Sequence, residues 1–437
     1  MKDLYDNEVS TKSDKTIDAI NRFTTSLVGY GTDFGVIFVA SDEDPDCAVA
    51  ATLGGILGLF LETPDRLEIA DTYFNRALTA APAATEREQL LVEAMWSSRQ
   101  GDLEKSLGCF RKLAKLYPND LLSAKMGQTH YFNLGDDEGM LWLADQVMEA
   151  HQGTAFAHGM RAFGLEQTSQ LEKAEEEARL ATEMQRAEPW AHHAAAHVMV
   201  TQGRHEEGIQ WMQDLSSEWD YCNSFMYTHN WWHLALFHLE REEFEEALHI
   251  YDTHVWGRDK TYSQDQINAI SLLWRLEMAG ADVGGRWEDV ANFVADRSFV
   301  LDQPFLDMQY VFALARGGKT LELNNLLAGM EMMEMDAPKM TRAVWEHVAT
   351  PASHAFVAFA NEDYARAEEL LSPARERMQS IGGSHAQRDL FEQVWIHSLI
   401  RQNKMKEALK ILEARIAFRK APALDLHLYQ QVKAAAA

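Results

Sequence analysis

One short motif recurs through the middle of the chain at a constant step. It reads GDLEKSL from residue 101, DDEGM from 136, QLEKA from 170 and GRHEEG from 203. The matching positions lie 34 residues apart, and they are Leu103, Asp137, Leu171 and His205. A repeated unit of this size cannot bury its apolar face alone, so it stacks on its neighbours. The chain is therefore constrained to an array of similar units.

The spacing of apolar residues predicts what each unit contains. Apolar residues recur at steps of three and four, alternating runs of β-branched residues are nearly absent, and the chain has only 10 prolines. These patterns indicate helices and no sheet. A period of about 34 residues is that of tetratricopeptide repeats, in which each unit is a pair of helices. We therefore predict an all-α protein, folded as a tetratricopeptide-like α-solenoid of antiparallel helix pairs.

The repeat becomes irregular toward the C-terminus. Later copies follow at steps of 33 to 44 residues, at Phe244, Trp287, Thr320, Tyr364 and Met405. We predict an N-terminal helical region over 1–100 and repeats over 101–437, irregular after about residue 220, in one continuous solenoid. The first helices of the pairs are expected near 155–166, 190–202, 226–240, 264–279, 303–317, 341–360 and 385–402. Their partners are expected near 171–186, 205–217, 243–255, 286–296, 319–333, 362–380 and 404–418.

Charge and cysteine content narrow the classes of partner. The chain has 40 Lys and Arg against 67 Asp and Glu, a formal charge of −27. This balance argues against binding to nucleic acid and to anionic membrane surfaces. The most apolar stretch, residues 47–61, is shorter than the roughly 20 residues that span a bilayer, so we predict a buried helix there. Three widely spaced cysteines fit a cytoplasmic protein without disulfides.

Two histidine pairs lie on neighbouring first helices. His193 and His197 are four residues apart, and His229 and His233 repeat this spacing one unit later. Residues four apart share one face of a helix, and first helices line the concave surface of such arrays. The four imidazoles can therefore converge as a nitrogen cage for a divalent metal ion such as zinc or iron, or act as general acids and bases. A polar pocket without metal and ordinary structural histidines are the alternatives.

Three more residues beside these pairs are candidate ligand contacts. Trp190 precedes the first pair, while Asn230 and Trp232 lie inside the second. Large aromatic side chains ordinarily pack helix against helix. One or two of these rings can instead form a platform for a planar ligand.

A polar turn precedes the helix expected near 385–402. Gly382 and Gly383 make the turn, and Ser384 with Gln387 three residues later has the pattern of a capping box. The box accounts for the start of the helix. The box does not involve the other polar side chains of the first turn, so it does not explain why they are there.

Those remaining side chains are His385, Arg388 and Asp389. An exposed helix start is the simplest explanation. The alternative is that Arg388 binds a carboxylate or phosphate group of a ligand, because a guanidinium matches such groups with two parallel hydrogen bonds. His385 would then point into the same cavity as a proton donor or acceptor.

Five strings of this sequence resemble those of the tetratricopeptide repeat protein 38 family, also called StaR-like proteins. They are AHHAAAHV (191–198), GRHEEG (203–208), HNWWHLALFHLE (229–240), SLLWRLEMAG (271–280) and GGSHAQRDLF (382–391), with a fainter likeness at 42–50. The resemblance covers most of the chain and implies a helical repeat fold without a settled activity. A flavoprotein hydroxylase role has been suggested for one member, but this chain has no GxGxxG fingerprint. The four histidines and the 385–389 group lie in these strings.

Two functions are consistent with these patterns. The first is an enzyme or binding protein for a small anionic or aromatic metabolite, with a His-, Trp- and Arg-lined internal pocket and a divalent metal as candidate cofactor. The second is a peptide-binding interaction scaffold, the usual role of such repeats. Peptide grooves that clamp carboxylates use Lys and Arg on the first helices, where this chain has His, Trp and Asn. We therefore favour a small-molecule partner; a homodimer is compatible with the sequence.

Overall fold

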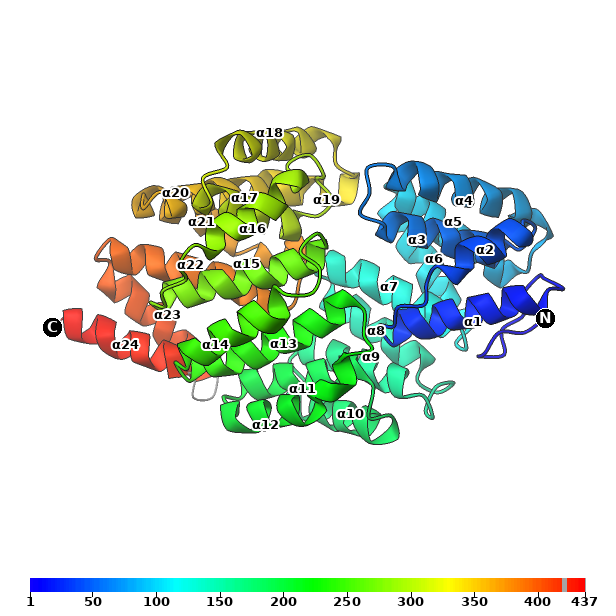
Figure 1. Cartoon of the computed structure of the whole chain (residues 1–437), viewed down its shortest axis with the longest axis horizontal. Helices are drawn as coiled ribbons and strands as arrows, with labels where there is room; N and C mark the ends of the chain where they lie inside the picture. The colour runs from blue at the N-terminus through cyan, green and yellow to red at the C-terminus, as the bar shows by residue number, and fades with distance from the viewer. Residues whose placement is uncertain (419–422, 437) are drawn as a thin grey trace.

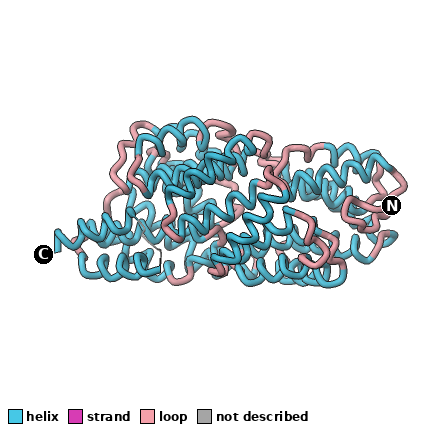
Figure 2. Tube along the Cα trace, turned by 90° about the horizontal axis from the view of Figure 1, so that it is seen from below, coloured by secondary structure: helices cyan, strands magenta, loops and turns pink. Residues whose placement is uncertain are grey.

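The computed structural model describes residues 1–418 and 423–436, and this part of the chain is all-α (Figures 1 and 2). Helices account for 77% of the residues. The described residues form no strand; their only β-type contact is an isolated bridge between Lys2 and Glu8. The prediction of an all-α protein is confirmed.

Several of the N-terminal helices begin at side-chain caps. Thr85 and Glu88 form a capping box at the start of α5. Asp102, Asp120 and Asp136 accept backbone N–H groups at the starts of α6, α7 and α8, which satisfies donors that the first turn leaves unpaired. The helices are α1 (Asp14–Val28), α2 (Val36–Glu43), α3 (Ala48–Phe60), α4 (Arg66–Ala80), α5 (Glu86–Arg99), α6 (Leu103–Leu116), α7 (Leu121–Asn133) and α8 (Asp137–Val147).

The middle and C-terminal helices follow the ranges expected from the repeat. They are α9 (Ala155–Gln167), α10 (Leu171–Met184), α11 (Pro189–Thr201), α12 (His205–Leu215), α13 (Ser224–Glu240), α14 (Phe244–Ile250), α15 (Ser263–Met278), α16 (Arg286–Val294), α17 (Pro304–Arg316), α18 (Thr320–Asp336), α19 (Lys339–Val344), α20 (Thr350–Ala360), α21 (Tyr364–Arg375), α22 (His385–Arg401), α23 (Met405–Phe418) and α24 (Ala423–Ala436). Some details differ from expectation. A π-helical turn, Tyr251–Val255, follows α14 within the range expected for one helix. A π-helical turn separates α19 from α20, and α24 follows the last copy of the motif, so the period did not predict it.

The repeat is visible in the backbone as a helix-ending turn. Gly101, Gly135, Ser169 and Gly203 have φ of +77°, +67°, +62° and +69°, and each lies two residues after the end of α5, α7, α9 or α11. A left-handed residue at this point stops a helix and turns the chain. The later copies keep the same device at changing steps, in Glu242, Gly280, Gly318, Glu362 and Asn403.

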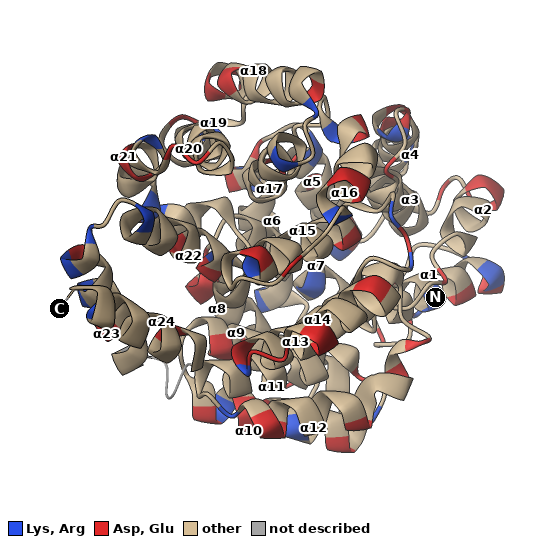
Figure 3. Cartoon of the chain, turned by 60° about the vertical axis from the view of Figure 1, so that its left-hand side comes forward, with Lys and Arg blue, Asp and Glu red and all other residues tan. Residues whose placement is uncertain are grey.

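Alternate helices pack in a row. α9 contacts α11, α11 contacts α13, α13 contacts α15, α15 contacts α17, and α17 contacts α20, while α10, α12, α16 and α18 each pack on the helix before them. The row then turns back, because α22 contacts α15 and α24 contacts α13 (Figure 1). Figure 3 shows acidic and basic residues interspersed over the outward-facing helices. Segments far apart in sequence therefore meet beside α13 and α15.

The apolar stretch at 47–61 forms α3, and the residues from Ala48 to Gly58 are buried. Glycine allows this helix to approach α4 closely: a Cβ at Gly58 would lie 2.8 Å from the backbone of Ala70. The buried helix expected there is confirmed. Among residues 1–418 and 423–436, no helix combines the length and apolarity needed to cross a bilayer. The proposed division at residue 100 stays a prediction; one apolar cluster runs from Val9 to Met126.

Candidate metal centre

Four imidazoles meet between α11 and α13, which pack against each other. His193 and His197 lie one turn apart on α11, and His229 and His233 lie one turn apart on α13. Their side chains are buried, with at most 2% of any residue exposed. One nitrogen from each ring lies within 4.8 Å of the other three. The structure thus brings the two sequence-predicted pairs together.

Three of the ring nitrogens face one another at short range. The Nε2 atom of His193 lies 2.9 Å from Nε2 of His197 and 3.1 Å from Nε2 of His229. A contact between two imidazole nitrogens holds one proton at most, so these atoms cannot all be satisfied by each other. Zinc–nitrogen bonds place neighbouring nitrogens of a tetrahedral site about 3.4 Å apart. The rings are therefore already close to a coordinating arrangement.

A chain of hydrogen bonds sets the proton position on His229. Thr228 Oγ1 donates to Asp265 Oδ1 at 2.9 Å, and Asn268 Nδ2 donates to Thr228 Oγ1 at 3.1 Å. The amide oxygen of Asn268, 2.9 Å from His229 Nδ1, must then accept from that nitrogen. The Nε2 lone pair of His229 consequently points toward the other imidazoles. Outer acceptors of this kind orient the histidine ligands of metal sites.

A buried carboxylate does the same for His197. Glu166 of α9 is 1% exposed, and its Oε2 atom lies 3.4 Å from His197 Nδ1. Burial alone would raise the pKa of Glu166, but attraction to His197 and hydrogen bonding with it lower that pKa below the ordinary value. Gln167 also donates to this carboxylate. A proton on His197 Nδ1 leaves Nε2 free to coordinate.

Other nitrogens of the cluster have no hydrogen-bond partner in the described part of the chain. They are Nδ1 of His193 and both ring nitrogens of His233. Buried polar atoms without a partner are rare and costly in folded proteins. Packing alone does not explain why both nitrogens of His233 are buried without a partner in that part of the chain. An ion among the four rings would bind at least one of them.

Burial keeps three of these imidazoles neutral. Burial first, and then the neighbouring imidazoles, lower the pKa of His193 and of His233 well below the usual histidine value. Burial likewise lowers the pKa of His229 to about 3. A neutral imidazole has the lone pair that a metal ion requires. The electrostatics of the cluster therefore favour coordination near neutral pH.

The two candidate tryptophans hold the imidazole rings in place. Trp190 stacks on His193 with ring centroids 4.3 Å apart, and Tyr30 stacks on Trp190 at 5.0 Å. Trp232 lies almost parallel to His229 at 5.3 Å. Trp190 is 8% exposed and therefore offers little surface to a planar ligand. Both rings thus pack against histidines of the cluster, and a ligand platform at Trp190 or Trp232 stays a prediction.

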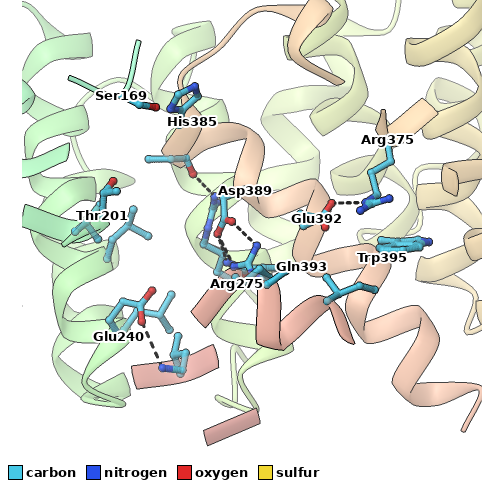
Figure 4. A pocket seen from close by; sticks show the side chains of 18 of the residues that line it. Ser169, Thr201, Glu240, Arg275, Arg375, His385, Asp389, Glu392, Gln393 and Trp395 are labelled. Atoms are coloured by element: carbon cyan, nitrogen blue, oxygen red, sulfur yellow. Dashed lines mark hydrogen bonds and ion pairs between the residues drawn. The ribbon is translucent and has the colours of Figure 1, made fainter. Parts of the chain in front are cut away.

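A cavity of about 890 Å³ adjoins this cluster (Figure 4). Thr201 and Leu236 line it. Thr201 lies four residues after His197 on α11, and Leu236 lies three residues after His233 on α13, so each shares a helix face with a histidine of the cluster. The four histidines do not line it, so they lie behind its wall rather than facing it as expected. Glu166 belongs to both sites, because it lines the cavity and contacts His197.

His385 and Asp389 of α22 line the same cavity. The side chain of His385 is 40% exposed, and its Nε2 lies 3.6 Å from Asp137 Oδ2. The carboxylate of Asp389 accepts from Arg415 of α23 at 2.7 Å. Figure 4 shows both side chains on the face of α22 that borders the cavity. The expectation that His385 reaches a cavity agrees with this placement.

Arg388 and Asn230 have other partners than the expected ligand. The Arg388 guanidinium donates to the carbonyl of Gly383 and is not among the cavity-lining groups, so it stabilises the turn. The capping box at Ser384 and Gln387 is present as predicted. Asn230 is fully buried, and its amide donates to the carbonyl of Pro189 at 3.3 Å. Direct ligand contact by Arg388 and by Asn230 stays a prediction.

Sequence reasoning missed Glu166 and Asn268, which orient the histidines. A signal existed for one of them. Asn268 follows His229 by 39 residues, the same step that separates His205 from Phe244. It therefore occupies the equivalent position one unit later. Glu166 has no such relation, and only the packing of α9 on α11 brings it to His197.

No protein-family model matches the sequence. The resemblance to the tetratricopeptide repeat protein 38 family therefore stays a prediction.

Proposed function

We propose that this chain is a metal-binding protein of the tetratricopeptide-like solenoid class that acts on or binds a small molecule. The ion is a divalent first-row transition metal held by His193, His197, His229 and His233. The observation that carries the proposal is the convergence of four buried imidazoles, two of them oriented by outer acceptors. The likeness to the tetratricopeptide repeat protein 38 family belongs to the same proposal.

The donor set selects the type of ion. Four imidazole nitrogens suit zinc, copper, nickel or iron, whereas magnesium and calcium prefer oxygen ligands. When bound, such an ion would supply Lewis-acid chemistry, or redox chemistry in the case of iron or copper. The residues of the chain contribute the rest: Glu166 and Asn268 fix the ligand protons, and His385 offers an exposed imidazole to a molecule in the cavity.

The arrangement favours this proposal over a peptide-binding scaffold. A peptide groove presents its polar side chains to solvent along several units. Here the polar side chains of α11 and α13 are buried against one another. Three cysteines are buried and form no disulfide: Cys47, Cys109 and Cys222. Because cysteines without disulfides fit a reducing compartment, we propose a cytoplasmic location. A homodimer stays a prediction.

The test is the metal content of the purified full-length protein and two variants. His193→Gln removes one proposed ligand. His192→Gln is the matched control, since His192 is equally buried on the same helix but accepts from Trp219 Nε1 at 3.1 Å and contacts the carbonyl of Arg186 at 2.8 Å.

After incubation with zinc or cobalt and gel filtration, elemental analysis should find one ion per chain in the wild type and in His192→Gln. His193→Gln should retain at most a small fraction. A wild-type protein that takes up neither ion, or a His193→Gln protein that retains a full equivalent, would refute the proposal.

A further inference from the structure

The cavity beside the histidine cluster has an apolar part and a polar end. Its apolar part is formed by Leu236 and Leu239 of α13, Ile411 and Ala414 of α23, and Leu424 of α24. The volume of about 890 Å³ is within the range of small-molecule sites in proteins. Apolar walls of this kind bind an aliphatic body by removing its surface from water.

The polar end lies where α9 and α11 finish and α22 begins. Ser169, Thr201 and His385 line it, and Figure 4 shows Ser169 and His385 pointing toward the same end. The start of α22 is fixed there, because the backbone N–H of His385 donates to Gln167 Oε1 at 3.1 Å. The Thr201 and Ser169 hydroxyls form no hydrogen bond with residues 1–418 or 423–436. Two hydroxyls and one imidazole are thus available to a ligand.

The charges at this end disfavour an anion. Glu166 lines the same end and is almost completely buried, so its carboxylate is poorly screened by solvent. The arginines that line the cavity already have partners. Arg275 of α15 donates to the carbonyls of Ala386 and Gln387. Arg375 of α21 pairs with Glu392 at 2.7 Å, and Arg415 of α23 pairs with Asp389 at 2.7 Å. An uncharged head that accepts or donates hydrogen bonds fits these surroundings better than a carboxylate or phosphate.

We propose that this cavity binds an amphipathic small molecule with an uncharged, hydrogen-bonding head and an aliphatic body. The head lies at Ser169, Thr201 and His385, next to Glu166, and the body lies along α13 and α23. This inference deepens the proposed function by naming the ligand class. Through Glu166, which contacts His197, the head comes to lie beside the proposed metal centre.

The experiment titrates the metal-free full-length protein with 1-butanol, 1-hexanol, 1-octanol and octanoate by calorimetry. Burial of each methylene is worth about fourfold in affinity, so Kd should fall about 200-fold from butanol to octanol. Octanoate should bind at least about tenfold more weakly than octanol, because its charge would lie beside Glu166.

Two variants locate the site. Ala414→Trp fills the cavity from an exposed position of α23, and Ile411→Gln makes its apolar wall polar. Each should weaken octanol binding at least about tenfold with an unchanged unfolding temperature. Leu321→Gln, on the exposed face of α18, is the control and should bind octanol as the wild type does.

Three results would each overturn the inference: a Kd that does not depend on chain length, octanoate binding more tightly than octanol, or octanol binding unchanged in both cavity variants. These outcomes are separate from those of the metal test. Ile411→Gln should retain a full equivalent of metal, and His193→Gln should retain octanol binding. Either proposal can therefore fail without the other.

Discussion

Replacing His233 by leucine should stabilise the metal-free protein and abolish metal binding. Both ring nitrogens of His233 are buried without a hydrogen-bond partner among the described residues, and 1% of the residue is exposed. A buried polar atom left unsatisfied costs about 1–3 kcal/mol. Leucine has a similar volume and no polar atom, so we expect a gain of about 1–3 kcal/mol in the free energy of unfolding.

The effect of His233→Leu on the free energy of unfolding changes sign when metal is present. An ion at 1,000 times its dissociation constant stabilises the folded state by about 4 kcal/mol, and His233→Leu should lose that increment. Calorimetry in chelator and in excess zinc measures both effects. For a chain of this length, each kcal/mol corresponds to about 2 °C or less in Tm. A His233→Leu protein that is less stable than the wild type in chelator would show that the imidazole already has a structural partner, which would refute the reasoning.

Three further predictions follow from individual contacts. Because burial lowers the pKa of His229 to about 3, the unfolded chain binds a proton there below about pH 6.5 that the folded chain does not. The metal-free protein should therefore lose about 1.4 kcal/mol of stability per pH unit for this histidine as pH falls from 6 toward 4; urea unfolding at several pH values should show this slope, and a flat profile would contradict it. Asn268→Ala should weaken zinc binding about 10- to 100-fold in a competition titration, since His229 loses the acceptor on its Nδ1; unchanged affinity would remove Asn268 from the centre. Gly135→Ala should lower the free energy of unfolding by about 2–4 kcal/mol, because φ is +67° and the added Cβ would overlap the carbonyl of Gln379. Gly108→Ala is the control, since no atom lies within 4 Å of the added Cβ. In thermal unfolding, Gly108→Ala should not destabilise the protein.

Local sequence patterns were sufficient to predict most of the fold. The turn residues at 101, 135, 169 and 203 recur at the period of the motif, and each takes the left-handed backbone that ends a helix. The break between α19 and α20 was not predictable in this way. A π-helical turn interrupts the helix expected over 341–360. The signal beside it is Pro351, near the start of α20, because proline lacks the backbone N–H that a continuous helix needs. Helix α24 was missed because it lies beyond the last copy of the motif.

The candidate site was predictable only as far as spacing within a helix determines it. Four-residue spacing placed His193 with His197 and His229 with His233, and the packing of α11 on α13 brought the pairs together. The roles of Arg388 and Glu166 depend on where each side chain folds. Arg388 binds a carbonyl five residues before it, and Glu166 reaches His197 from another helix, so no local pattern could assign either role.

The central claim is that His193, His197, His229 and His233 hold one metal ion together. X-ray absorption spectroscopy of the zinc-loaded full-length protein tests this claim most directly, because it reports the ligand atoms and their distances. The account predicts a first shell of nitrogen at about 2.0–2.1 Å, with the outer-shell scattering of several imidazole rings. A first shell dominated by sulfur or by carboxylate oxygen, or one with fewer than four imidazoles, would contradict it.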